Sequence, residues 1–267
     1  AARRAITVVT LFGGFASTVS WPLTSALLNA LDWRQVYFLY AAAQLVFCLP
    51  AYLFALSRRP APGSPAAPVP TSVDEPAPLQ GEARRRAFLL FAVLLAVFNL
   101  VSAGLTVLMI QTLTEMGHAR DHAVLAAALF GPAQVAGRVW EMASQGKVSA
   151  LGVGRLASAL LPVALLLLYG AGWSLASAIA FALVFGLSNG LMTIAKGTVA
   201  LALFGRGGYG ALFGRLSVAS LLFRALGPFL FAALAGAGGE AAMIAVMTGF
   251  ALAGLAACES LIRVARR

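Results

Sequence analysis

Apolar runs of about 20 residues recur along this chain, and they limit its possible folds more than any other feature. A run of that length crosses the roughly 30 Å hydrocarbon core of a bilayer as an α-helix. Hydrophobic residues make up 61% of the chain and charged residues 10%, whereas about 25% of the residues of a soluble domain are charged. The sequence therefore predicts an all-α integral membrane protein with eight transmembrane helices. The predicted runs are Ile6–Leu31, Val36–Leu56, Ala87–Leu113, Ala123–Trp140, Leu156–Trp173, Leu175–Ile194, Leu212–Ala235 and Ala241–Leu261.

The basic residues lie between the apolar runs. A formal net charge of +10 would suit nucleic acid only on a soluble basic face, so we expect no nucleic-acid partner. If residues 1–5 are cytoplasmic, the positive-inside rule is obeyed, and only Arg34 and Arg120 fall clearly outside. Both ends of the chain are then cytoplasmic, and the Ala-, Gly- and Arg-rich composition favours a bacterial inner membrane. The cytoplasmic basic residues are Arg3, Arg4, Arg58, Arg59, Arg84, Arg85, Arg86, Lys147, Arg155, Arg206, Arg263, Arg266 and Arg267.

A proline-rich, basic segment separates the second run from the third. The stretch SRRPAPGSPAAPVPTSVDEPAPLQGEARRR holds seven of the twelve prolines, and such a composition cannot bury a core. The sequence therefore predicts two helices in residues 1–57, a cytoplasmic linker in residues 58–86 and six helices in residues 87–267. The first residues, AARRAI, lack an initiator Met, and transporters are often built from two halves of six helices. We therefore expect that further helices precede this chain.

Three stretches of the sequence resemble the major facilitator superfamily, from its fifth helix to its twelfth. Residues 13–43, GGFASTVSWPLTSALLNALDWRQVYFLYAAA, are similar to the fifth helix and the turn into the sixth. ALFGRGGYGALFG and RALGPFLFAAL resemble the loop after the tenth helix and the Gly-Pro pattern of the eleventh. The loop between the eighth and ninth helices departs from the family, because AGRVWEMASQGKVSALGVGR keeps Gly137 and Arg138 and lacks the Asp of the usual pattern.

The resemblance implies a secondary transporter that moves a small organic solute by rocking two halves around a midplane site. This chain would lack the first four helices and half of that site. Its partners would be those N-terminal helices of the same polypeptide, the lipid bilayer and the solute. No Asp or Glu reaches midplane depth in the predicted runs, so if a proton gradient drives transport, the proton-carrying carboxylate lies upstream. The positive inner cavity favours an anionic or neutral solute over a cation.

Polar side chains recur at helical spacing on three predicted helices and mark faces that turn away from lipid. In the family the seventh and tenth helices line the central cavity and the eighth and eleventh flank it, so the resemblance directs these faces inward. The other interpretation is that the hydroxyl and amide groups hydrogen-bond neighbouring helices and serve packing. The three stripes are Asn99, Ser102 and Thr106; Gln134, Arg138 and Glu141; and Asn189, Thr193 and Lys196.

Depth in the membrane separates the charged candidates. At a rise of about 1.5 Å per residue, Arg224 lies roughly 14 Å from the inner end of its run, near the midplane, where a charge is costly without water or a partner. Arg138 and Glu141 lie near the cytoplasmic side, where they can also form a structural ion pair. Lys196 lies roughly 33 Å from the outer start of its run, which places it at the cytoplasmic mouth. There it can serve topology and anchoring, with its side chain reaching water, or attract an anionic solute. For Arg224 the alternative is a structural pair with an acid on a missing helix.

The candidate solute site is Asn99, Ser102, Thr106, Asn189, Thr193 and Arg224, and the candidate gate is Gln134, Arg138, Glu141 and Lys196.

Groups that support catalysis or metal binding are sparse. The only histidines, His118 and His122, lie in a polar outer segment where no further Cys or His completes a zinc site. Cys48 and Cys258 lie within apolar runs and are interpreted as packing residues. No nucleotide loop or nucleophile motif is present, so we expect neither an enzyme nor a cofactor. A transport-inactive sensor or scaffold with the same fold is the alternative function.

Three further expectations concern local packing. Prolines inside runs can kink them, and small residues permit close helix approach. We also expect Glu259 to pair with Arg263, one helical turn later. The prolines are Pro22, Pro132 and Pro228, and the glycines are Gly13, Gly14, Gly131 and Gly137.

Overall fold

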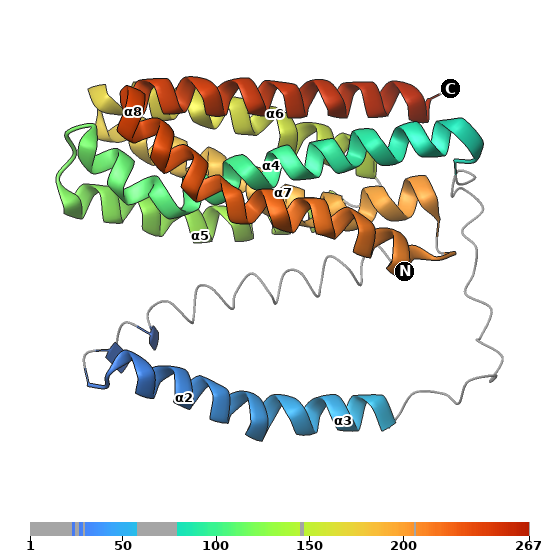
Figure 1. Cartoon of the computed structure of the whole chain (residues 1–267), viewed down its shortest axis with the longest axis horizontal. Coiled ribbons are helices and arrows are strands. Elements are labelled where there is room, and N and C mark those ends of the chain that lie inside the picture. Colours follow the sequence, from blue (N-terminus) through green and yellow to red (C-terminus); the bar gives the residue numbers. More distant parts are fainter. Residues whose placement is uncertain are drawn as a thin grey trace. The chain divides into compact units, whose positions relative to one another are not determined.

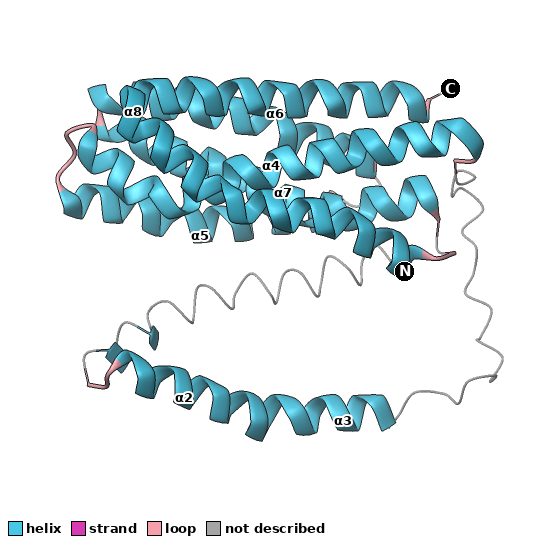
Figure 2. Ribbon diagram, in the orientation of Figure 1, coloured by secondary structure: helices cyan, strands magenta, loops and turns pink. Residues whose placement is uncertain are grey.

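The computed structural model describes residues 23–24, 27–28, 30–57, 79–144, 147–205 and 207–266. These residues form helices joined by short turns, with no strand among them (Figure 2). The predicted all-α class is therefore confirmed for this part of the chain. Six of its helices are long and apolar enough to cross a membrane. Most of the first predicted run, Gly13, Gly14, Pro22 and linker residues 58–78 lie outside the described residues, so the total of eight crossings stays a prediction.

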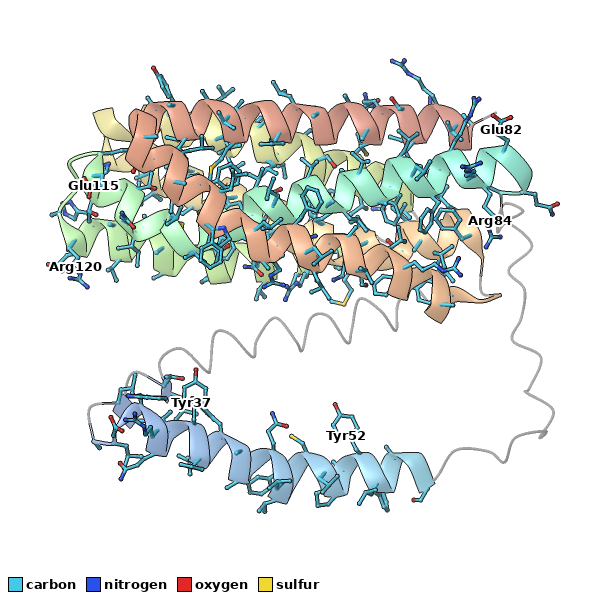
Figure 3. The ribbon with its side chains drawn as sticks, in the orientation of Figure 1. Tyr37, Tyr52, Glu82, Arg84, Glu115 and Arg120 are labelled. Carbon is cyan, nitrogen blue, oxygen red and sulfur yellow. The ribbon has the colours of Figure 1, made fainter. Side chains whose placement is uncertain are left out.

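One unit carries the second predicted run. Its helices α2 (Trp33–Ala43), η1 (a π-helical stretch, Gln44–Cys48) and α3 (Leu49–Ser57) follow one another without interruption (Figure 1). The backbone N–H of Asp32 donates to Gln35 Oε1 at 3.0 Å and so caps the start of α2. Within this unit the large apolar side chains extend outward, as Tyr37 and Tyr52 do in Figure 3. A helix this apolar needs lipid or another helix to cover those side chains.

The other unit is a helical bundle that begins after the linker. Its last helix, α8, has 57 residues and would measure about 86 Å if it were straight, nearly three times the thickness of a hydrocarbon core. Gly239 interrupts it with φ 78° and ψ 172°, and the two arms on either side run in opposite directions (Figure 1). The arms correspond to the last two predicted runs. The bundle elements are α4 (Gly81–Glu115), α5 (Arg120–Ala143), α6 (Ala150–Tyr169), η2 (Gly170–Trp173), α7 (Leu175–Phe204) and α8 (Tyr209–Ala265).

Local signals set the helix ends in this bundle. The side chains of Ser149 and Ser174 accept hydrogen bonds from the backbone N–H groups three residues later and so cap α6 and α7. The helix α7 continues to Phe204, well beyond the predicted end at Ile194, and stops where Gly205 adopts φ 73°. The helix α4 begins at Gly81, so the last residues assigned to the linker are helical.

Glycines allow two pairs of helices to approach very closely. A Cβ atom at Gly190 of α7 would lie 2.3 Å from the carbonyl oxygen of Gln134 in α5. A Cβ atom at Gly227 in the first arm of α8 would lie 2.3 Å from the carbonyl oxygen of Leu100 in α4. Such small-residue contacts are typical of helix packing in membranes. The close approach predicted at Gly137 is confirmed, because a Cβ there would lie 3.0 Å from the Leu187 carbonyl oxygen.

Two other packing expectations concern Gly131 and the prolines. No described atom lies within 4 Å of a Cβ at Gly131, so no close approach is seen there among the described residues. The helices continue through Pro132 of α5 and Pro228 of α8, and the non-helical dihedrals inside α8 occur at Gly239, so a kink at these prolines stays a prediction. A proline leaves one backbone carbonyl of the preceding turn without its helical hydrogen bond, and neighbouring groups can satisfy that carbonyl while the helix continues. The backbone conformation at Gly239 is different, because essentially only glycine adopts it.

The two ends of the bundle differ in charge. At one end α4, α6 and the first arm of α8 begin, and α5, α7 and the second arm end; we call this the basic end. The backbone N–H of Leu79 donates to the carbonyl oxygen of Leu203 there, which joins the start of α4 to the end of α7. We call the opposite end, which holds Glu115 and Glu240, the acidic end. There His118 Nε2 lies 2.7 Å from the Ala171 carbonyl oxygen, a hydrogen bond between the α4–α5 turn and η2. Figure 3 shows Arg84 and Glu115 at these two ends of α4.

Candidate functional site

The polar stripe on α7 lies partly on the outside of the bundle. Thr193 Oγ1 donates to the Asn189 carbonyl oxygen at 2.8 Å, and both residues are half-buried. Lys196 is exposed, and its Nζ lies 5.9 Å from the centre of the Phe213 ring in α8. Because α7 extends to Phe204, Lys196 lies about two turns inside the helix and not at its end.

Arg224 lies midway between Tyr209 and Gly239, the limits of the first arm of α8. It is exposed, as are the apolar side chains around it, including Leu221 and Leu226. Its positive charge lies near that of Lys196 of α7, and both side chains are exposed; we call these two residues the positive pair. Arg224 therefore lies at the middle of this arm, and its depth in a membrane stays a prediction.

The polar stripe on α4 does not present one uniform face. Asn99 is half-buried and donates from Nδ2 to the Leu95 carbonyl oxygen at 2.8 Å. Thr106 is exposed and donates to the Ser102 carbonyl oxygen at 2.7 Å. Ser102 is buried, and its hydroxyl has no hydrogen-bond partner among the described residues. The hydrogen bonds of Asn99 and Thr106 stay within their own helix, so these groups do not join α4 to its neighbours.

The stripe on α5 is the most buried of the three. Glu141 is fully buried, Arg138 is 6% exposed, and Arg138 Nη2 donates to Gln134 Oε1 at 3.2 Å. Neither charge is left without an interaction, as buried charges require. Both residues lie in the last two turns of α5, at the basic end. A role in gating stays a prediction.

Glu259 forms an ion pair with Arg155 of α6, and the expected pair with Arg263 is therefore wrong. The sequence spacing offered a possible partner one turn away on the same helix. The packing of the second arm of α8 against α6 places an arginine from another helix nearer.

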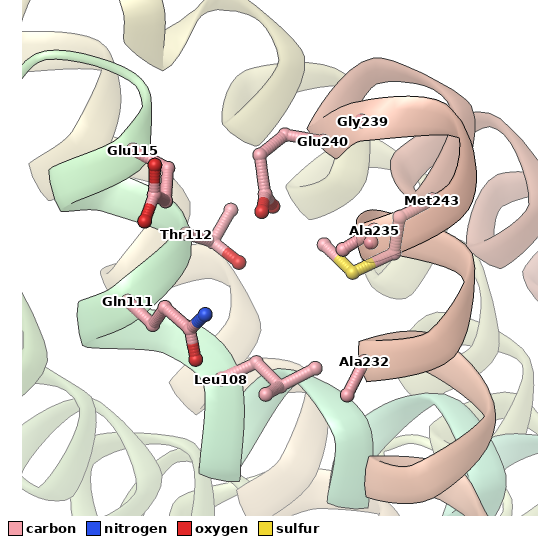
Figure 4. Close-up of a pocket in the computed structure, with 10 residues that line it drawn as sticks. Leu108, Gln111, Thr112, Glu115, Ala232, Ala235, Gly239, Glu240 and Met243 are labelled. Atoms are coloured by element: carbon pink, nitrogen blue, oxygen red, sulfur yellow. The ribbon is translucent and has the colours of Figure 1, made fainter.

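A pocket of about 390 Å³ lies at the acidic end, between α4 and the turn of α8 at Gly239 (Figure 4). The polar groups that line it include Gln111, Thr112 and Glu115 of α4 and Glu240 of α8. The residues predicted for the solute site do not line it. Sequence reasoning missed this pocket because it sought charges at midplane depth, although polar residues do recur at the end of α4.

Comparisons with known proteins leave the family open. No protein-family model matches this sequence, and no curated protein is significantly similar to it. The function is therefore argued from the residues and their arrangement.

Metal-binding clusters are also lacking in the described part of the chain. No group of three or more His, Cys, Asp or Glu side chains there is arranged to hold a metal ion. His118 contacts a backbone carbonyl, and His122 is exposed at the start of α5. Cys48 is half-buried and Cys258 is buried, and both are free thiols.

Proposed function

We propose that this chain is the C-terminal part of a secondary transporter that moves a small organic solute across a membrane by alternating access. The helices of the bundle are long and apolar enough to cross a bilayer. The sequence resembles the major facilitator superfamily from its fifth helix to its twelfth. The proposed setting is a bacterial inner membrane, with both ends of this chain cytoplasmic, as the basic end favours.

The order in which the bundle helices pack carries the proposal. Transporters of this class contain three-helix repeats nested within each six-helix half. If the six helices form two such trios, α4 is the first helix of one and packs closely on the first arm of α8, the second helix of the other. In the same way α7, the first helix of the second trio, packs closely on α5, the second helix of the first. The Gly227 and Gly190 contacts mark these two crossings, and this reciprocal packing supports the proposal.

The positive pair of Lys196 and Arg224 supports a solute that carries a negative or strongly polar group. An arginine at the middle of an apolar helix is costly unless water, a counter-charge or a bound anion meets it. Asn99, Thr193 and the rest of the candidate solute site would complete the cavity together with helices upstream of this chain. A proton gradient is a suitable energy source only if those helices supply a carboxylate.

The test is transport by the full-length protein in proteoliposomes, with a panel of labelled small organic acids and neutral solutes. We expect uptake of at least one solute, and a decrease of about tenfold or more for Arg224→Gln, because a charge-assisted interaction would be lost. Arg263→Gln, at the end of α8, is the matched control and should transport normally. Binding of a solute without flux would instead favour a transport-inactive sensor or scaffold. The absence of both binding and flux for every solute in the panel would reject the proposal.

A further inference from the structure

The pocket at the acidic end combines charge and apolar surface in a way that the proposed transport does not explain. Its volume of about 390 Å³ falls within the range of small-molecule sites. Leu108, Ala232, Ala235 and Met243 form its apolar lining. Among the described residues, no Lys or Arg lines it, and the charged groups that do are the carboxylates of Glu115 and Glu240.

One of its polar groups has no partner in the described part of the protein. Glu240 Oε2 is buried and accepts no hydrogen bond there. Thr112, which also lines the pocket, is only 3% exposed. Figure 4 shows the Glu240 carboxylate and the Thr112 hydroxyl directed into the space between α4 and α8. A buried carboxylate oxygen without a partner is costly, and a bound hydrogen-bond donor would satisfy it.

We propose that this pocket binds a small organic cation, a primary ammonium group attached to an apolar body. The ammonium group would donate to Glu240 and Thr112, with Glu115 and Gln111 beside them, and the apolar body would contact Leu108 and Met243. An ammonium group carries three donors and no acceptor, which suits carboxylate and hydroxyl oxygens. A metal ion suits the pocket less well, because no group of three or more His, Cys, Asp or Glu side chains among the described residues is arranged to hold one.

This inference goes beyond the proposed transport and is tested without it. Calorimetry on the full-length protein in detergent would compare 2-phenylethylamine, phenylacetate and 2-phenylethanol, which share one body and differ in charge. We expect saturable binding of the amine alone. Glu240→Gln should weaken that binding by about tenfold or more, because a charge-assisted hydrogen bond is lost.

The threonine variants separate binding from folding. Thr112→Val keeps the shape of the side chain and removes the hydroxyl, and it should weaken binding by about threefold to tenfold. Thr112→Ser keeps the hydroxyl and should bind like the parent protein. Asp121→Asn, an acid at the same end that does not line the pocket, should leave the affinity unchanged. Absence of amine binding, equal binding of phenylacetate, or full affinity in Glu240→Gln would overturn the proposal.

Discussion

At the scale of single residues, the closest helix contacts leave room for glycine and for no larger residue. Gly190→Ala would place a methyl group against the Gln134 carbonyl oxygen, where a Cβ has only 2.3 Å. We expect it to lower the free energy of unfolding by about 1–3 kcal/mol, as overpacking does. Gly249→Ala, also within a helix but in open space, is the control and should be as stable as the parent or more so. Reversible unfolding in SDS measures both, and equal stabilities would contradict the contact.

At the scale of elements, the turn inside α8 depends on one backbone conformation. Gly239, at φ 78° and ψ 172°, occupies a region that side chains make costly by about 1–3 kcal/mol. Gly239→Ala should therefore destabilise the antiparallel packing of the two arms and lower the midpoint of thermal unfolding. Gly236→Ala, on the same arm with ordinary helical dihedrals and open space, should not. If Gly239→Ala melts at the parent's temperature, the turn does not require glycine.

At the scale of the whole molecule, the difference in charge between the two ends predicts the orientation of the bundle. In a variant without Cys48 and Cys258, a single cysteine at Asp121 should react with a membrane-impermeant thiol reagent added to intact cells. A cysteine at Lys147 should react only after the cells are permeabilised. Both parent residues are exposed, so access is limited by the membrane alone. The reverse labelling pattern would overturn the assignment of the basic end to the cytoplasm.

Several features of the bundle could be predicted from the sequence because they are local. The positions of the apolar helices follow from hydropathy, since each helix satisfies its own backbone hydrogen bonds. The central place of Arg224 in its helix and the close approach at Gly137 also follow from position along the chain. The end of α7 at Phe204 was missed, because its last turns contain Lys196 and lower the local hydropathy signal.

The sequence by itself determined the helical class, the order and approximate positions of the apolar helices and the gathering of basic residues between them, because these properties depend on neighbours along the chain. Only the tertiary structure decided which helix faces meet. It paired Glu259 with Arg155 and brought Thr112 and Glu240 into one pocket, although more than a hundred residues separate them. The physical reason is that such contacts depend on the rotation and crossing of packed helices, and the chain's local pattern leaves these undetermined.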